Sequence, residues 1–209
     1  MKKIILTIAV AALAATSAFA QFSVGAGYAR TSSTAKSGST TSKEDPLNGF
    51  YAGFDYGVNI AGSFKVTPGV YFSMFTGQTD YSVGSLANTK ATRTEMYLNI
   101  PVNFSYSFPL GSSVSAFVFA GPTANVGLSD KLKIDVNTVV GGGSSSYDVY
   151  KENSDYKRFD IMIGGGAGID IVNKVRVSVG YNYGLLDRDG SSNSTLHRSE
   201  LHAGVAYLF

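Results

Sequence analysis

The stretch from Ser199 to Phe209 alternates with a strict period of two residues. Because successive side chains of a β-strand point to opposite faces, this pattern predicts a strand with one wholly apolar side. The opposite side is mixed and carries Glu200 and His202. Such a strand constrains the fold strongly, since its apolar face must contact a core or lipid. The apolar side consists of Leu201, Ala203, Val205, Tyr207 and Phe209.

Seven further segments alternate in the same way and have about the length of tilted membrane strands. The chain also holds 24 Gly, 13 Tyr and 13 Phe, a composition that suits strands and turns better than helices. We therefore predict an all-β fold, an eight-stranded antiparallel up-and-down transmembrane β-barrel that occupies residues 21–209 as one domain. The seven segments are Phe22–Ala29, Gly49–Ile60, Phe64–Gln78, Thr92–Phe108, Val114–Leu128, Tyr156–Ile171 and Val175–Leu185.

The connections between these segments alternate in length. Long loops at one end and short turns at the other, with both termini at the short-turn end, are typical of bacterial outer-membrane barrels. We expect the long connections, which are rich in Ser, Thr and Gly, to be surface loops that bury little. The long connections are Arg30–Asn48, Thr79–Ala91, Ser129–Asp155 and Leu186–Arg198, and the short ones are Ala61–Ser63, Pro109–Ser113 and Val172–Lys174.

The first twenty residues read as a secretory signal peptide. Lys2 and Lys3 precede an apolar run from Ile4 to Leu13, and Ala18-Phe19-Ala20 forms the small-residue site, with cleavage expected before Gln21. The apolar run is shorter than the roughly 20 residues of a membrane helix, and no later stretch is long enough either. We expect export to the outer membrane of a Gram-negative bacterium.

Charge distinguishes a membrane barrel from a soluble carrier, which would place its apolar face inside. The non-apolar face of the segments holds nearly all their charged residues, yet it is crowded with Gly, Tyr, Phe and Asn, which is typical of a packed interior. An outward Arg or Lys near the bilayer midplane costs about 2–4 kcal/mol, so the apolar face is expected to meet lipid. The inward charged residues are Asp55, Lys65, Arg93, Glu95, Arg158, Asp160, Asp170, Arg176 and Glu200.

An eight-stranded barrel is just wide enough for side chains to fill, and charges removed from water must pair. We therefore expect the inward charges to form an ion-pair network that closes the lumen to large solutes. A narrow path for small solutes through that network remains an alternative.

The chain resembles the PorT-like outer-membrane β-barrels, which are small barrels of the OmpA/OmpX kind, over essentially its whole mature length. The resemblance implies the fold and the location. Members of this family have no assigned activity, and no motif here matches a residue that performs the secretion role in the family's name. The residues that carry the resemblance are Tyr97-Leu98-Asn99-Ile100-Pro101-Val102, Gly164-Gly165-Gly166-Ala167-Gly168 and the aromatic C-terminus.

Other candidate chemistry is sparse. His197 and Ser199 resemble the His-x-Ser pair of outer-membrane lipid A deacylases, with Asp187 or Asp189 available to orient the imidazole, so a lipid-modifying enzyme is a second alternative. The glycine run lacks the spacing of a phosphate loop and is expected to make space inside the barrel. His202 is expected to be a satisfied interior histidine, and a single histidine with scattered carboxylates is not a metal site.

Composition removes further classes. The chain has no Cys, which excludes disulfides and thiolate chemistry, and without the two signal lysines the basic and acidic residues are equal in number. That balance gives no support for nucleic-acid binding, and we expect no cofactor. The leading interpretation is a monomeric scaffold in outer-membrane lipid whose four loops meet an unknown extracellular ligand. Tyr207 and Phe209 also resemble the assembly signal read by the outer-membrane insertion machinery.

Overall fold

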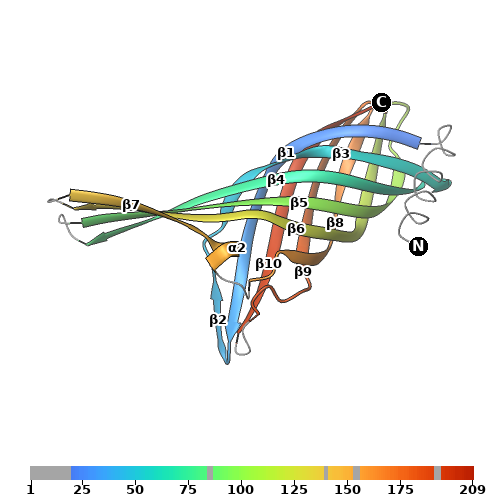
Figure 1. Ribbon diagram of the computed structural model, residues 1–209. Helices are drawn as coiled ribbons and strands as arrows, with labels where there is room; N and C mark the ends of the chain where they lie inside the picture. The colour runs from blue at the N-terminus through green and yellow to red at the C-terminus, as the bar shows by residue number, and fades with distance from the viewer. Residues whose placement is uncertain (1–19, 84–86, 139–140, 153–155, 191–193) are drawn as a thin grey trace, which may run out of the picture.

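Eight β-strands close into an antiparallel ring in the computed structural model, which describes residues 20–83, 87–138, 141–152, 156–190 and 194–209 (Figure 1). The predicted signal peptide falls on residues 1–19, outside that range, and stays a prediction. The ring consists of β1 (Ala20–Ser37), β3 (Leu47–Ala61), β4 (Phe64–Val83), β5 (Ala87–Pro109), β6 (Val114–Thr138), β8 (Phe159–Ile171), β9 (Val175–Gly184) and β10 (Ser194–Leu208).

Pairing of the first and last strands closes the ring and confirms the predicted barrel. Val24 of β1 lies opposite Tyr207 of β10 on one side and opposite Phe54 of β3 on the other. The amide of Phe209 donates to the carbonyl of Phe22 at 2.9 Å, so the ladder continues to the chain end. Closure removes the open sheet edge that lipid could not satisfy.

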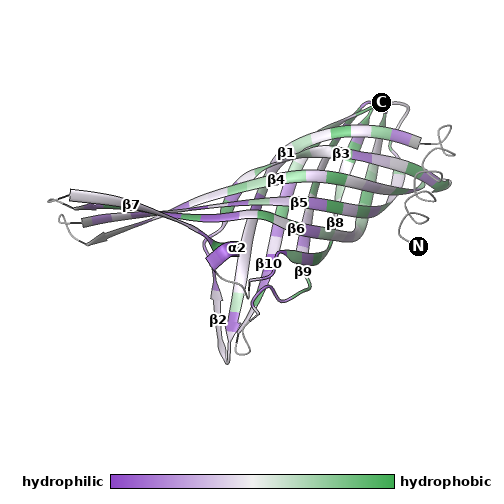
Figure 2. Cartoon of the chain, in the orientation of Figure 1, coloured by the Kyte–Doolittle hydropathy of each residue, from purple (hydrophilic) through white to green (hydrophobic). Residues whose placement is uncertain are grey.

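The outward face of the ring is apolar, as the alternation predicted. Phe50 and Val205 are 50% and 57% exposed, whereas the inward rings of Phe75 and Tyr97 are fully buried. Hydrophobic residues gather on the barrel strands, and hydrophilic residues prevail on the parts that project from it (Figure 2). This belt marks the membrane-spanning part, which in β6 runs from Val114 to Leu128. Within the described residues, no helix is both long and apolar enough to cross a bilayer.

Three short turns connect the strands at one end, as predicted. They are residues 62–63, 110–113 and 172–174. Gly62 adopts a φ of 55°, which glycine tolerates readily, while Val172 and Asn173 adopt φ of 52° and 53°. A positive φ is unusual for a β-branched residue, and here two successive positive values reverse the chain between β8 and β9.

The expected long loops are largely strand, which corrects the boundaries drawn from the sequence. β1 continues past Ala29 to Ser37, β6 continues past Leu128 to Thr138, and β10 begins at Ser194 rather than Ser199. Apolar alternation marks only the part of a strand that faces lipid. Beyond the bilayer the backbone ladder continues, because neighbouring strands still supply hydrogen-bond partners and polar side chains can face water on both sides.

These continuations form two projections at the end of the barrel opposite the C-terminus (Figure 1). The long extension comprises residues 77–83, 87–95 and 130–138 with β7 (Gly141–Asp148), and the short extension comprises residues 34–37 and 194–197 with β2 (Thr40–Lys43). A one-turn helix, α2 (Val149–Glu152), follows β7 and leads back towards the barrel. The long connections expected from the sequence therefore lie largely in these sheets.

Candidate functional site in the barrel interior

A buried arginine of β10 organises the extracellular half of the interior. Arg198 is 1% exposed. Its Nη2 pairs with Glu200 Oε2 at 3.0 Å, and its Nε donates to Thr31 Oγ1 at 2.6 Å. Its guanidinium also lies 3.7 Å from the ring centroid of Tyr97. Charge, hydrogen bonds and an aromatic face therefore satisfy this cation in a place that water does not reach.

Tyr97 lies against a second arginine, Arg188, whose guanidinium carbon is 5.3 Å from the ring centroid. The Tyr97 hydroxyl donates to Glu95 Oε2 at 2.8 Å and accepts from Arg188 Nη1 at 2.9 Å. Tyr97 is the first residue of the motif that carried the family resemblance. Its position explains why a tyrosine suits that place, since it contacts both buried cations and one carboxylate.

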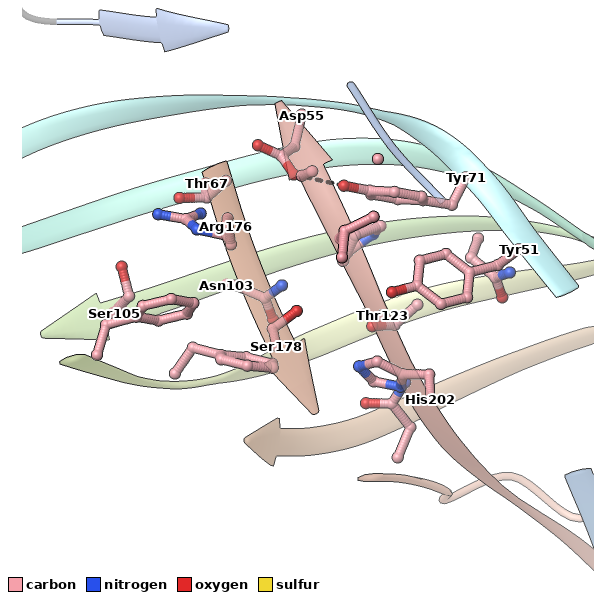
Figure 3. A pocket seen from close by; sticks show the side chains of 18 of the residues that line it. Tyr51, Asp55, Thr67, Tyr71, Asn103, Ser105, Thr123, Arg176, Ser178 and His202 are labelled. Carbon is pink, nitrogen blue, oxygen red and sulfur yellow. Dashed lines mark hydrogen bonds between the residues drawn. The ribbon is translucent and has the colours of Figure 1, made fainter. Parts of the chain in front are cut away.

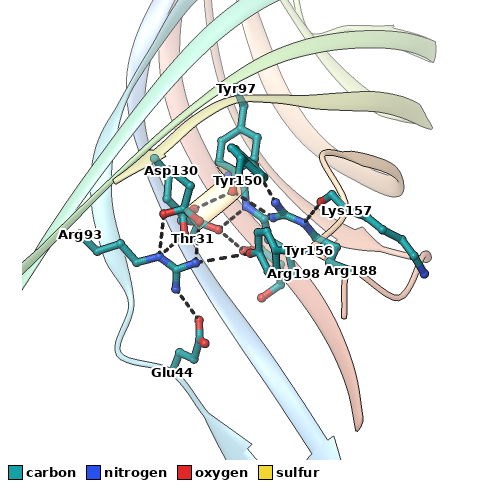
Figure 4. Close-up of polar contacts among 12 residues, drawn as sticks. Thr31, Glu44, Arg93, Tyr97, Asp130, Tyr150, Tyr156, Lys157, Arg188 and Arg198 are labelled. Atoms are coloured by element: carbon teal, nitrogen blue, oxygen red, sulfur yellow. Dashed lines mark hydrogen bonds and ion pairs between the residues drawn. The ribbon is translucent and has the colours of Figure 1, made fainter. Parts of the chain in front are cut away.

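Arg188 comes from the β9–β10 connection and not from the barrel wall (Figure 4). Its Nη2 donates to the hydroxyl of Tyr150 in α2 at 3.0 Å, which joins two connections across the barrel mouth. The segment is fastened on both sides, because the Arg188 amide donates to Leu196 O and the Arg188 carbonyl accepts from Lys157 N, both at 3.0 Å. We name Tyr97, Arg188 and Arg198 together the plug.

Ionic contacts continue above the plug at the base of the long extension. Arg93 reaches Asp130 at 2.8 Å, Glu95 at 3.0 Å and Glu44 at 3.2 Å. Burial raises the pKa of the Asp130 carboxyl, and its hydrogen bonds with Arg93 act in the opposite direction. Burial also raises the pKa of Tyr156 to about 12, so its hydroxyl stays protonated at neutral pH.

A chain of amide hydrogen bonds runs beneath the plug. Arg198 Nη1 donates to Asn125 Oδ1 at 3.3 Å, Asn125 Nδ2 donates to Asn99 Oδ1 at 2.5 Å, and Asn99 Nδ2 donates to Ser73 Oγ at 2.8 Å. These four residues come from β10, β6, β5 and β4. The chain therefore ties one side of the wall to the other through buried groups.

The periplasmic half of the interior is hollow. A cavity of about 130 Å³ lies between the amide chain and the short-turn end, and we name it the chamber (Figure 3). Its wall combines aromatic rings with hydroxyl and amide side chains, including Tyr51, Thr67, Asn103, Phe119, Ser178 and His202.

The charged side chains beside the chamber have hydrogen-bond partners in the wall. Arg176 holds Asp170 in a two-bond pair, with Nε to Oδ1 and Nη2 to Oδ2 both at 2.8 Å. Asp55 accepts from the Ser23 hydroxyl at 2.5 Å and from the Tyr71 hydroxyl. Lys65 Nζ lies 3.3 Å from Gln21 Oε1.

The glycine run of β8 makes space for aromatic rings, as expected. A Cβ added at Gly166 would lie 2.6 Å from Phe119 Cζ, and one at Gly168 would lie 2.5 Å from Phe117 Cζ. No ordinary side chain fits there, because real Cβ contacts are longer. The run is thus explained by packing inside a narrow barrel.

A match to a known protein family agrees with this architecture. The family model described as outer membrane protein beta-barrel domain matches residues 16–189. The chain belongs to this family. Membership places this outer-membrane barrel in the envelope of Gram-negative bacteria and does not assign a specific activity.

Several solved structures are similar to this outer-membrane barrel. Ail of Yersinia pestis, in complex with the heparin analogue sucrose octasulfate, is 17% identical, with a TM-score of 0.46 over 91% of this chain and 99% of that one. Neisserial surface protein A is 20% identical, with a TM-score of 0.44 over 90% and 97%. OprG from Pseudomonas aeruginosa is 13% identical, with a TM-score of 0.40 over 91% and 96%. No curated protein sequence matches the chain.

The structure separates the charged residues predicted to lie inside. Glu95, Asp160 and Glu200 are buried near the plug, Arg93 lies above it, and Asp55, Lys65, Asp170 and Arg176 lie around the chamber. The prediction that Arg158 faces inward is wrong. Arg158 is exposed, and its guanidinium lies 4.5 Å from the Tyr150 ring centroid. β8 begins only at Phe159, so the alternation that assigned an inward face to Arg158 does not extend to it.

Sequence reasoning missed both arginines of the plug. Arg198 shares the parity of Glu200, so extending the alternation of the last strand would have found it. Arg188 stands in an irregular connection, where no periodicity indicates a direction. His202 also differs from expectation, since its Nδ1 is buried without a hydrogen-bond partner in the described part of the chain.

The two side chains of the candidate catalytic pair each contact a backbone carbonyl of a neighbouring segment. His197 Nδ1 lies 3.1 Å from the carbonyl of Gly184, and Ser199 Oγ donates to the carbonyl of Ser32 at 3.3 Å. Asp187 Oδ1 accepts from the amides of Leu196 and Asp189, and so shapes the connection. Each of these groups therefore has a structural partner within its own neighbourhood.

Proposed function

We propose that this protein is a rigid outer-membrane anchor that presents the long extension to a partner at the cell surface. The observation that carries the proposal is the continuation of β4, β5 and β6 beyond the apolar belt, joined by β7. The ring of the barrel closes without this projecting sheet. The sheet is therefore not needed for closure and is available to contact a partner. The extension carries charges of both signs, including Asp80, Lys90 and Asp135, which suits contact with a polar partner.

The edges of the extension are the proposed contact surface. β3 pairs with β4 only as far as Thr76, so residues 77–83 form one edge, and β7 forms the other. Unpaired backbone groups on an edge strand can pair with an extended segment of another protein, which gives affinity through main-chain hydrogen bonds. The ligand is therefore expected to be a protein with an exposed extended segment.

Shortening the extension tests this proposal. Gln78 lies opposite Thr92, and Lys131 lies opposite Asp148, so two-residue turns joining each pair would remove the sheet and keep the barrel register. The refolded variant should keep its heat-modifiable gel mobility and lose proteins that the full chain retains from growth medium. A matched variant joining Thr34 to Lys43 removes β2 and the end of β1 from the short extension and should retain them. Equal retention by all three forms would contradict the proposal.

We also propose that the barrel is monomeric and has no large-pore activity. The closed ring leaves no strand edge in the bilayer for a second copy, and the plug fills the extracellular half with side chains. The narrow-channel alternative receives less support, because the connection that carries Arg188 is fastened on both sides. Porin-sized conductance steps of the refolded protein in planar bilayers would overturn this part of the proposal.

We propose no enzymatic activity at His197, given the partners of that side chain and of Ser199. An unchanged lipid A acyl pattern in cells expressing Ser199→Ala, compared with the unaltered chain, is the expected result. The finer resemblance to PorT-like barrels also stays a proposal, and it adds no role beyond that of a surface anchor.

The aromatic end is proposed as the signal for the outer-membrane insertion machinery. Phe209 is 64% exposed, and its ring lies 4.9 Å from Tyr207 and 5.7 Å from Phe22, at the lipid face. Deleting Phe209 should slow insertion in cells and change the urea midpoint of inserted barrels little. Insertion at the normal rate would contradict a signalling role.

A further inference from the structure

Several polar groups that line the chamber differ from those of the plug in having no hydrogen-bond partner in the described part of the protein. Within the described residues, the hydroxyls of Tyr51 and Ser178, the amides of Asn103 and Asn182, and His202 Nδ1 make no side-chain hydrogen bond to protein. Of these atoms only His202 Nδ1 is fully buried, and buried polar groups are almost always satisfied. The others belong to half-buried residues that line the chamber, so they can donate to and accept from whatever fills it.

The unsatisfied groups are neutral. The three charges nearest to them already have partners in the wall, since Arg176 is held by Asp170, Glu200 by Arg198, and Asp55 by two hydroxyls. Asp55 has only neutral partners, but an ionic ligand would lose its hydration in a chamber whose unpartnered polar groups are neutral. A ligand that presents several neutral hydroxyls would match the hydroxyls, amides and imidazole of the wall.

Aromatic rings form a second, complementary wall. Tyr51 stands edge-on to His202 at a centroid distance of 5.9 Å, and Phe119 lies 6.4 Å from His202. Phe117 lies 6.0 Å from Phe119 and extends this surface. An aromatic face beside a polar wall suits a solute with one apolar C–H face and hydroxyls around its edge.

We propose that the chamber is a binding site for a small, neutral, polyhydroxylated solute of the sugar type, admitted from the periplasmic end. The plug closes the other end, and the chamber begins where the Arg176–Asp170 pair stands, close to the short turns. A volume of about 130 Å³ holds on the order of ten water molecules, at roughly 10–15 Å³ of probe-occupied space for each. One small solute could replace most of them. This site is independent of the partner proposed for the long extension.

Saturation-transfer NMR on the refolded mature chain in detergent micelles tests the site with three probes. D-glucose is the expected ligand, tetramethylammonium tests an organic cation, and inorganic phosphate tests an anion. Glucose should give a saturable signal, and the other two should give none. Asn103→Leu keeps the number of side-chain heavy atoms and removes the amide, so it should weaken glucose binding about tenfold. Ser178→Leu fills the chamber and should abolish binding.

Asn137→Leu is the matched control, because Asn137 is an exposed asparagine of the same kind of strand, on the long extension. This variant should bind glucose as the unaltered chain does. All variants are checked by heat-modifiable gel mobility, and if Ser178→Leu fails to fold, Asn103→Leu still decides. A glucose signal that survives Asn103→Leu unchanged, the absence of any glucose signal, or stronger binding of tetramethylammonium or phosphate would each overturn the proposal.

Discussion

The two halves of the barrel interior are lined by the same strands and are filled in opposite ways. In the extracellular half, Asn99 takes part in a chain of buried hydrogen bonds. Asn103 lies four residues further along β5 on the same face, and it lines the chamber without a protein hydrogen-bond partner. The difference comes from the connections. The β9–β10 connection and α2 are long enough to send Arg188 and Tyr150 back into the mouth, whereas two- to four-residue turns cannot reach the other end. Closure of such a barrel therefore depends on what its connections supply, as well as on its wall.

Among the variants that compare the two halves, removal of Arg198 is expected to cause the largest loss of stability. Arg198→Ala would leave Glu200 buried without its cation and Asn125 without its donor. Loss of one member of a buried ion pair costs about 3–5 kcal/mol, and urea unfolding in micelles should show a loss of that size. Arg30→Ala, at an exposed arginine of β1, is the control and should change stability by less than about 0.5 kcal/mol. Equal effects of the two variants would mean that the plug contributes nothing specific to stability.

Removing Arg188 tests whether the plug seals the lumen. Arg188→Ala deletes a side chain whose partners are Tyr97 and Tyr150, so it leaves no carboxylate unpaired and should cost less, about 1–3 kcal/mol. It should also join the chamber to the extracellular side. Small-ion conductance should then appear in planar bilayers, at steps well below porin size. If Arg188→Ala stays as silent as the unaltered protein, the seal lies elsewhere.

Asn99→Leu and Asn103→Leu compare the halves directly on one strand. Both changes keep the number of side-chain heavy atoms, and both residues face inward. Asn99→Leu leaves the Asn125 Nδ2 donor without its acceptor and the Ser73 hydroxyl without its donor, which should cost about 2–4 kcal/mol in urea unfolding. Asn103→Leu breaks no protein hydrogen bond and should change stability by less than about 0.5 kcal/mol. Similar losses for the two would show that protein contacts satisfy Asn103 as they do Asn99.

Alternation in the sequence was enough to predict the barrel, its lipid face and its short turns, because lipid contact imposes a period of two on every strand. It could not predict the strand ends, since outside the bilayer no apolar face is required and Thr31–Ser42 reads as loop while forming a hairpin. Alternation correctly placed Asp160 and Glu200 inside because both lie within regular strands. It missed Arg188 because that residue lies in an irregular connection. Parity assigns a direction only within a regular strand, and Arg188 and Arg158 stand outside one.

The smallest expected effect comes from one hydroxyl in each half. Tyr97→Phe keeps the ring between the two arginines and removes only the bonds to Glu95 and Arg188, whose other contacts remain, so the expected loss is about 1–2 kcal/mol. Tyr51→Phe removes a hydroxyl that has no protein partner in the described chain, and its stability should stay within about 0.5 kcal/mol of the original. For glucose binding at the proposed site, the order of the two variants is the opposite. Tyr51→Phe should weaken the glucose signal, and Tyr97→Phe should not. A stability loss from Tyr51→Phe as large as that from Tyr97→Phe would show that the chamber is held together by its polar groups, and the division of the interior into a bonded half and a hollow half would fail.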